Sequence, residues 1–495
     1  MALTALPARA GNFITEDASL APVTALSLYS RVYYLGSSTL GDALSGVPTA
    51  ITDLDDFTNL FGSSDAINLN NIELYLNNLT NGLYFVKVKP APVATVTISN
   101  AAAGTYTVII NGVDTVVTVA ANPVPTLQSV INAVKEAINN NTAINTYVEA
   151  EILYDNAGVP VYTGAFRIRS KAQNPFTLTA TGANITVSAV TVPTVLNYWD
   201  YLSTIAQLIK TEAESPLGII VCPEAFYNLT AVHERNIVGN RLENVARVHK
   251  WMAFIDPGKP SNVINSIAAK NDAFGYVASL GHSAYYYPYA ADLTDNDVSP
   301  SVIAAAYAMQ CYQSLGIDKP PAGSDFPLKG ISKLRDTLSD GQKNDLAQAK
   351  INIITYKSGV GFVPYDTLTR SDDPRFKMIS ARVILNCLER SIQQSVDVSG
   401  ILFQSNRARG VFYIKFRAVL ENVVGVFYNA GALYGATAED GYHVRCDESI
   451  QDNANLQNGI VKALVYAVPA GTVRQTETVV YPIQIGGIPT ALTLG

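Results

Sequence analysis

The sequence predicts a mixed α/β (α+β) protein of several domains, and three observations support this. Between residues 217 and 316, buried-strand patterns alternate with helical patterns, which is typical of a mainly parallel sheet with crossover helices. The chain has 495 residues, enough for roughly three domains of about 150 residues each. A stretch rich in Val and Thr begins near Pro90, so a different kind of domain is expected to start there.

Composition narrows the class of protein. Hydrophobic residues make up 48% of the chain, but charged residues only 15%, well below the usual quarter or so. With 27 tyrosines, the chain has either large protein interfaces or a tyrosine-rich core, and composition leaves both open. The net charge of −7 argues against direct binding of nucleic acid by the whole chain.

The cysteines and the apolar segments predict a protein of a reducing compartment that is neither secreted nor inserted in a membrane. Cys222, Cys311, Cys387 and Cys446 are far apart and form no C-x-x-C motif, which is typical of reduced, buried thiols. The first ten residues lack the charged start and apolar run of a signal peptide. No stretch approaches about 18 uninterrupted apolar residues, so no membrane span is expected.

The first ninety residues are expected to form an arm followed by strands and helices. Residues 1–20 are polar and irregular, as in an extended arm, and 27–36 form a β-rich run. A turn-rich connector covers 43–51, a second helix covers 70–82 and ends at Gly82, and a strand covers 83–90.

The stretch DLDDFTNLFG at 53–62 has two interpretations. Its apolar residues recur on one helical face, and Asp53 stands where an N-cap belongs, with two more acids in the first turn. The alternative is an acidic metal site, which would need ligands from elsewhere because no His or Cys is near in the sequence. The capping interpretation is favoured.

Residues 91–194 are expected to form an inserted, β-rich domain. Asn111-Gly112 lies between two β-runs, a strong signal for a hairpin, and 126–140 carries a helical apolar stripe. Further β-runs cover 147–154, 161–170 and 176–190.

After Pro193 the α/β alternation begins. Strands are expected at 217–224, 251–258 and 282–290, and helices at 233–250, 263–271 and 298–316. The last helix has Ser299 as its expected cap and Pro300 at its first position.

The sequence contains no recognisable catalytic motif and no phosphate-binding glycine loop. The four histidines (His233, His249, His282 and His443) are scattered, and a scattered histidine is more often structural than catalytic. The carboxylate pairs Asp372–Asp373 and Glu439–Asp440 lie in turn-like contexts, which predicts capping or solvation. We therefore expect no enzyme activity, no metal and no cofactor.

The order of several weaker motifs resembles the contractile tail sheath proteins of bacteriophages and related contractile injection systems. The motifs are DFTNLFG, NIELYLNNLTNG and LYFVKV near the N-terminus, then DVSPSVIAAAYAMQCYQSLGIDKPPAG (297–323) with PLKGI (327–331), LSDGQKNDLAQAKINIITYKSGVGFVPYDTLTR (338–370), FKMISARVILNCLERSIQQSV (376–396), ENVVGVFYNAGALYG (421–435) and GYHVRCDES (441–449). One departure is that GNFITEDASLAPV stands where many sheath proteins carry a Pro-Gly-Val-Tyr-like motif.

The resemblance implies a division of the chain. Residues 1–20 would be the N-terminal arm, 21–90 and 195–370 a discontinuous α/β sheath core, 91–194 an outer inserted domain, and 371–495 a C-terminal sheath domain with a terminal exchange strand.

It also implies a function. The chain would stack as six-fold rings in a helical homo-oligomer around a tail tube protein, touch baseplate and tail terminator proteins, and contract for genome delivery. It would belong to the virion and assemble in the host cytoplasm. There are two alternatives: a non-contractile structural virion protein, and an α/β enzyme with an unrecognised site.

Two sets of residues are candidates for assembly contacts. The C-terminal β-run 476–486 would pair with a neighbouring subunit through Thr478, Val479, Val480, Tyr481, Ile483 and Ile485, although pairing within its own chain is the alternative. Between residues 375 and 417, eight basic residues face only two acids. This local excess of charge predicts either a tube-facing patch or a solvated helix face. The basic residues are Arg375, Lys377, Arg382, Arg390, Arg407, Arg409, Lys415 and Arg417.

Overall fold

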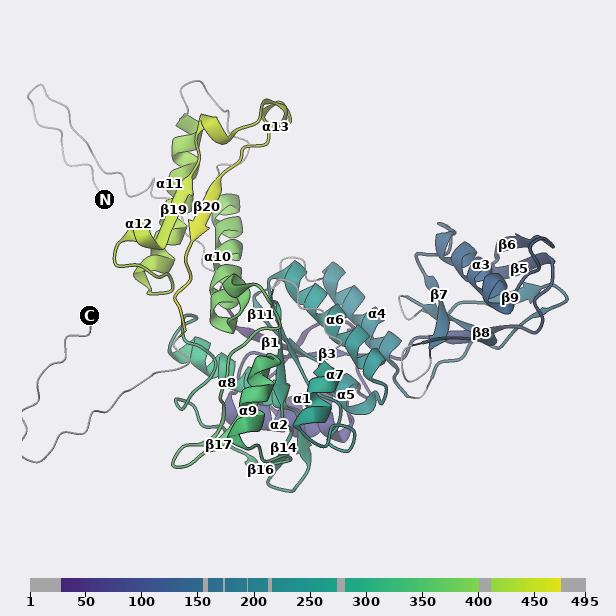
Figure 1. The fold of residues 1–495 in the computed structure, drawn as a ribbon, viewed down its shortest axis with the longest axis horizontal. Helices are drawn as coiled ribbons and strands as arrows, with labels where there is room; N and C mark the ends of the chain where they lie inside the picture. Colours follow the sequence, from purple (N-terminus) through teal and green to yellow (C-terminus); the bar gives the residue numbers. More distant parts are fainter. Residues whose placement is uncertain are drawn as a thin grey trace, which may run out of the picture.

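The computed structural model describes residues 28–154, 159–171, 174–193, 195–211, 216–273, 281–399 and 411–472. The expected N-terminal arm and the terminal β-run lie outside these residues. Within them the chain forms a central α/β body, a segment that projects from one side, and a helical C-terminal part on the other side (Figure 1). No helix among the described residues is both long enough and apolar enough to span a bilayer.

An eight-stranded sheet forms the centre of the body, in the order β18-β17-β13-β12-β11-β1-β3-β2. The strands between β3 and β17 pair in parallel, and the two edge strands are antiparallel. This confirms the predicted α/β fold class. The strands are β1 (Arg31–Gly36), β2 (Thr49–Ile51), β3 (Leu83–Lys87), β11 (Gly218–Val221), β12 (Met252–Ile255), β13 (Ser283–Tyr287), β17 (Ile351–Lys357) and β18 (Gly361–Pro364).

Helices cover the sheet. α6 (Val232–His249) packs on β11, β12 and β13, and α4 (Tyr198–Thr211) packs on α6. α8 (Pro300–Ser314) packs on β1, β11, β12 and β13 and is itself covered by α2 (Ala66–Asn78). Nearly every side chain of α8 is buried, as expected for a helix that is apolar all round. Many of the buried side chains of this body are tyrosines, so the tyrosine-rich core interpretation holds here.

Smaller elements complete the body. A three-stranded sheet has the order β15-β14-β16. The remaining elements are η2 (Asp42–Leu44), α1 (Leu54–Phe61), α5 (Pro223–Asn228), α7 (Ser266–Ala273), β14 (Ala290–Asp292), β15 (Asp297–Val298), β16 (Ile331–Leu334), α9 (Asp340–Gln348) and η3 (Pro374–Phe376).

The capping interpretation of residues 53–62 is confirmed. A side-chain oxygen of Asp53 accepts a hydrogen bond of 2.7 Å from the backbone N–H of Asp56, at the start of α1. Phe57 and Phe61 are fully buried, with ring centroids 4.9 and 4.8 Å from that of Phe85 on β3. The acidic triplet therefore starts a helix whose apolar face docks on the sheet.

Three local predictions need correction. The second helix begins earlier than expected, at Ala66 after the cap Asp65, and ends at Asn78 rather than at Gly82, which lies in the following turn at φ 80°. Ser299 precedes α8, but its hydroxyl makes no capping bond and instead accepts from the Asn71 side chain. The β-run 176–190 is broken at Gly182, where φ is 151°, into two short strands.

The segment predicted as an insertion has a hydrophobic core of its own, between Ala94 and Ile185. Two sheets, β10-β4-β8-β7 and β6-β5-β9, are bridged by α3, which packs on β6, β7 and β8. The expected turn at Asn111-Gly112 is present, with positive φ at both residues. The elements are β4 (Val93–Ile98), β5 (Gly104–Ile110), β6 (Val113–Val119), α3 (Leu127–Asn140), β7 (Val148–Tyr154), β8 (Pro160–Ser170), β9 (Leu178–Thr181) and β10 (Ile185–Val187).

The C-terminal part is mainly helical. Two long helices, α10 and α11, pack on each other, and a two-stranded antiparallel sheet, β19-β20, packs on α11. The elements are α10 (Ile379–Val398), α11 (Val411–Asn429), α12 (Ala438–Gly441), β19 (Tyr442–Arg445), η4 (Glu448–Ile450), α13 (Asn453–Gln457) and β20 (Leu464–Ala467).

Candidate assembly surface of the C-terminal part

Four of the eight basic residues predicted to face a tube are exposed. Arg375 and Lys377 lie in and just after η3, and Lys415 and Arg417 lie on α11. Two of them pair with nearby acids: Arg375 with Asp373 at 2.6 Å, and Arg417 with Glu421 at 3.4 Å. Arg407 and Arg409 lie outside the described residues. The tube-facing role itself stays a prediction.

Arg382 and Arg390 do not lie on the surface, which corrects the expectation of one exposed basic patch. Both are on α10 and only 4% exposed. Arg382 donates to the side-chain oxygens of Asn386 and Glu389, each at 2.9 Å, and Arg390 donates to the backbone oxygen of His249 at 3.1 Å. A buried guanidinium needs acceptors for its N–H groups. Arg382 finds them on α10 itself, whereas Arg390 joins α10 to the end of α6.

The buried face of α10 meets the central body at a polar seam. The Asn386 amide donates to the Tyr29 hydroxyl at 2.9 Å and to the Trp251 backbone oxygen at 3.4 Å. Across the seam, Lys250 forms an ion pair with Glu389, and this charge helps to lower the carboxyl pKa against the effect of burial. The two bodies are therefore joined by hydrogen bonds and ion pairs as well as by apolar packing.

His282 lies at the same seam and does not act as a base there. Its Nδ1 lies 3.1 Å from the Trp251 backbone oxygen. Burial, helped by the positive charge of Arg382, lowers the pKa of His282 to about 3, so the ring is neutral at physiological pH. This agrees with the structural interpretation of the scattered histidines.

The carboxylate pairs also behave as expected. Asp373 caps η3 by accepting from the Arg375 backbone N–H, and Asp372 pairs with Lys350. Asp440 forms a capping box with Thr437 at the start of α12. The positive partners of Asp372 and Asp373 hold both carboxyl pKa values below their usual range.

The β19-β20 sheet is a candidate assembly feature that the sequence motifs did not reveal. Within the described residues it has only two strands, so each presents an outer edge whose backbone groups can pair with a further strand. Apolar side chains around it are exposed: Tyr434 by 66%, Ile460 by 54% and Tyr466 by 56%. The alternating run LVYAV at 464–468, which ends before Pro469, was the signal that could have revealed β20.

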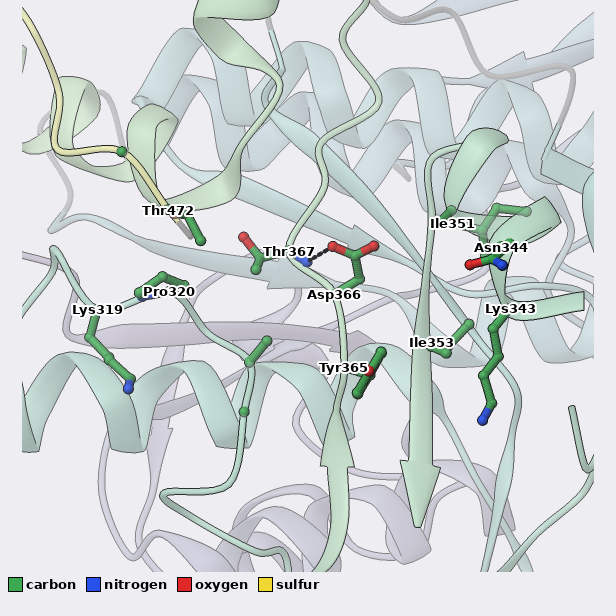
Figure 2. A pocket seen from close by; sticks show the side chains of 14 residues that line it. Lys319, Pro320, Lys343, Asn344, Ile351, Ile353, Tyr365, Asp366, Thr367 and Thr472 are labelled. Carbon is green, nitrogen blue, oxygen red and sulfur yellow. Dashed lines mark hydrogen bonds between the residues drawn. The ribbon is translucent and has the colours of Figure 1, made fainter. Parts of the chain in front are cut away.

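The last described residues, Gly471 and Thr472, lie at the central body, next to the start of α10. Gly471 and Thr472 line a cavity of about 500 Å³ whose other walls come from α9, β17, the loop 319–323 and residues 365–367. Figure 2 shows Thr472 opposite Thr367 at one side of this cavity. The hydroxyl of Thr472 lies 2.7 Å from that of Ser380 at the start of α10. The predicted exchange strand, from Thr478 to Ile485, follows a few residues later and lies outside the described residues.

The carboxyl ends of the parallel strands are where an α/β enzyme would bind its ligand. The chain order reverses between β1 and β11, and a pocket of about 390 Å³ lies there, lined by Ser37, Ser64 and Glu224 among others. Glu224, which is 3% exposed, accepts from the Ser37 hydroxyl at 2.6 Å and from the Asn68 amide at 2.8 Å. These hydrogen bonds join the end of β1 to α2 and α5. The polar side chains at this pocket therefore have a structural role in holding the three elements together.

No group of three or more His, Cys, Asp or Glu side chains that could hold a metal occurs in the described part of the chain. The four cysteines are free and buried, as the sequence predicts. Burial raises the pKa of the Cys222 thiol well above its usual value, so it is not an activated nucleophile.

Comparisons with known proteins find similarity in structure but not in sequence. No protein-family model matches the chain, and no curated protein matches it in sequence. Solved structures share its fold. A chain of the anti-feeding prophage (AFP) baseplate, 6-fold symmetrised, has a TM-score of 0.56 at 17% identity, over 97% of this chain and 100% of that chain.

Two contracted sheaths are similar to the same degree. The sheath complex of PVC, an extracellular contractile injection system, gives a TM-score of 0.54 at 16% identity, over 97% of this chain and 99% of that chain. The AFP helical sheath gives 0.54 at 17% identity, with the same coverage.

The architecture defines a multidomain α/β protein whose parallel core carries a helical C-terminal part with an open two-stranded sheet. This is the fold of the sheath proteins of contractile injection systems. The resemblance stated from the sequence motifs is therefore confirmed as a likeness of fold.

Proposed function

We propose that this chain is the structural subunit of a contractile tail sheath. It assembles into a helical stack of six-fold rings around a tail tube and contracts to drive the tube through the host envelope during genome delivery. The observation that carries the proposal is a shared fold over 97% of this chain and 99% of two sheath chains solved in the contracted state.

Strand exchange links the subunits in this proposal. The open edges of β19 and β20 accept arms from neighbouring copies, contributed by residues 1–20 and by the run Thr478–Ile485. Contacts of this head-to-tail kind do not close on themselves and so generate an extended helix. The exposed Tyr434, Ile460 and Tyr466 give the added strands an apolar surface to cover.

The tube contact is electrostatic. Arg375, Lys377, Lys415 and Arg417 are exposed, and Arg407 and Arg409 lie on the stretch of chain that links the two long helices. Exposed ion pairs are individually weak, so such a contact holds the tube in register and still slips during contraction. An acidic outer surface on the tube protein is the expected complement.

The same proposal assigns roles to the parts of the chain and to its partners. The core comprises 21–90 and 195–370, the outer domain 91–194 and the C-terminal domain 371–495. Baseplate and tail terminator proteins cap the stack, which belongs to the virion after assembly in the host cytoplasm. Subunits move as rigid bodies on exchanged-strand hinges and need no enzyme activity, cofactor, nucleic-acid contact or membrane contact.

Negative-stain electron microscopy of the protein, alone and co-expressed with candidate tube proteins, tests the proposal. Striated hollow cylinders that shorten are the expected result. Variants lacking 1–20 or 473–495 should remain folded by circular dichroism and form no cylinders. Cylinders that never shorten would indicate a non-contractile structural protein, and discrete particles under every condition would return the α/β enzyme to consideration.

A further inference from the structure

A cleft of about 590 Å³ lies where the segment 91–194 meets the central body. One face of α4 and one face of α6 form its sides, and Thr146, Glu149 and Lys171 close it from the inserted segment. Its volume falls in the range of small-molecule sites. The assembly surface proposed above lies elsewhere, on the C-terminal part.

Buried polar contacts of residues next to the cleft lining in sequence join the two parts. The Asp200 carboxylate accepts from the backbone N–H groups of Ala91 and Asn197, at 2.7 and 2.8 Å, and so ties together both strands that connect the segment to the body. Arg169 of β8, which is 2% exposed, donates to Asn197 at 2.6 Å and to Glu151 at 2.9 Å. The two sides of the cleft are thereby fixed relative to each other, and a preorganised site loses less entropy on binding.

Two hydrogen-bond donors at the cleft are left unsatisfied by the described part of the chain. The indole nitrogen of Trp199 and the Nε of Arg241 are buried, and neither has a hydrogen-bond partner among the described residues. Buried donors are nearly always satisfied, because a donor left without an acceptor keeps the full cost of its desolvation. Both groups would be satisfied by a ligand rich in acceptors.

The rest of the lining narrows the ligand class. Amide side chains, which both donate and accept, come from Gln207, Asn240 and Asn244, and the apolar side chains of Leu202 and Ile237 lie among them. Lys171 and Arg241 outweigh the single acid Glu149, so the cleft carries a small positive excess. The hydroxyl groups of a sugar can form hydrogen bonds with the amide side chains, and the face of its ring can pack on an aromatic side chain. A carboxylate on the ligand can accept charge-assisted hydrogen bonds from a guanidinium.

We propose that this junction cleft binds an acidic saccharide, with the sugar ring against Trp199 and its carboxylate at Arg241. A bare inorganic anion would leave the apolar side chains uncovered. Lys171 already pairs with Glu149 at 3.6 Å, so the guanidinium of Arg241 is the basic group that a neutral sugar would leave without a carboxylate. The inference does not depend on the sheath proposal, because it concerns a site outside the C-terminal part.

Tryptophan fluorescence measures this binding directly. The chain has two tryptophans, and the other, Trp251, is fully buried with its indole N–H bonded to the Pro216 backbone oxygen at 3.0 Å. The full-length protein is titrated with D-glucuronate, with D-glucose and with acetate. We expect a saturable change in fluorescence with glucuronate. The affinity for glucose should be at least about tenfold weaker, and acetate should cause no change.

Paired substitutions locate the site. Arg241→Gln should weaken glucuronate binding about tenfold or more, because it removes a charge-assisted hydrogen bond. Arg167→Gln, an exposed arginine on β8 outside the cleft, is the matched control and should leave binding unchanged. Lys171→Gln is the second variant if Arg241→Gln does not fold by circular dichroism.

Three results would overturn the inference. They are no saturable change with glucuronate, equal affinity for acetate or glucose, and equal affinity in the cleft variants and the control. Cylinder formation, measured separately, decides the sheath proposal, so the two can fail independently.

Discussion

The eight-stranded sheet of the body and the two-stranded β19-β20 sheet differ in how far their strands are buried. Strands β11, β12 and β13 are buried along their whole length and covered by helices on both faces. In β19 only Val444 is buried, and no residue of β20 is fully buried. The central strands of the body are buried by their own chain, whereas the small sheet, within the described residues, has open edges and exposed apolar side chains. A substitution in the first should therefore unfold the subunit, and one in the second should impair its assembly.

The largest effect is expected at the buried ion pair of Arg235 and Asp272 in the body. Both side chains are 2% exposed, and Asp272 also accepts from the Tyr285 hydroxyl at 2.9 Å. Arg235→Met leaves a buried charge without its partner and should cost roughly 3–5 kcal/mol of unfolding free energy. Urea denaturation measures this. Arg417→Met, which removes one partner of an exposed pair, is the control and should cost about 0.5 kcal/mol or less.

A pH-dependent effect is expected at Asp256, at the end of β12. Burial raises its carboxyl pKa to about 7, against the opposing effect of hydrogen bonds from Ser301. The folded protein therefore binds a proton that the unfolded chain releases at about pH 4, so this contribution to stability is present at low pH and is lost as pH rises to about 7.

Asp256→Asn removes this titration. On going from pH 5 to pH 8 the wild type loses this contribution and the variant does not. The unfolding free energy of the variant minus that of the wild type should therefore rise by roughly 2–4 kcal/mol over this range. Urea denaturation of both proteins at the two pH values gives this difference, and the titration of other groups cancels in it. Parallel pH profiles would contradict the assignment.

A smaller effect is expected at the cap of α1. Asp53→Ala removes the acceptor for the Asp56 backbone N–H and should cost about 1 kcal/mol. Thermal unfolding measures the loss. Asp53→Ser retains a capping oxygen and should recover most of it; equal loss in both variants would mean that the cap contributes little.

The smallest effect on folding, paired with a large effect on assembly, is expected at β20. Tyr466→Glu places a charge on an exposed position and should change the unfolding free energy by no more than about 0.5 kcal/mol. Under the sheath proposal, the same substitution should sharply reduce cylinder formation in electron micrographs, because it charges the surface that an added strand covers. Unchanged cylinders would remove β19-β20 from the interface.

Local patterns in the sequence were sufficient for most elements. The alternation after Pro193, the Asn111-Gly112 turn and the Asp53 cap depend on residues near one another in the chain, and all three are present. The boundaries that were wrong have local alternatives of similar strength. Asp65 starts the second helix earlier than the apolar stripe indicates, and Gly182 breaks a β-run that composition alone presents as continuous.

The basic residues from 375 to 417 show where sequence reasoning stops. Their count is a property of the sequence, but their exposure is not. Arg382 and Arg390 are buried on the side of α10 where Asn386 meets Tyr29 and Trp251, which lie 357 and 135 residues away in the chain. Charge counting cannot distinguish a helix face that meets solvent from one that meets another part of the protein.

The sequence by itself determined most of the helices and strands, the parallel α/β class and the order of motifs that resembles a sheath, because periodicity, caps and turns act over a few residues. Only the tertiary structure decided which charges are accessible, that β19 and β20 pair with open edges, and that Arg169 and Asp200 fix a cleft between two parts of the chain. These features depend on contacts between residues far apart in the sequence, and a contact of that kind leaves no local pattern to read.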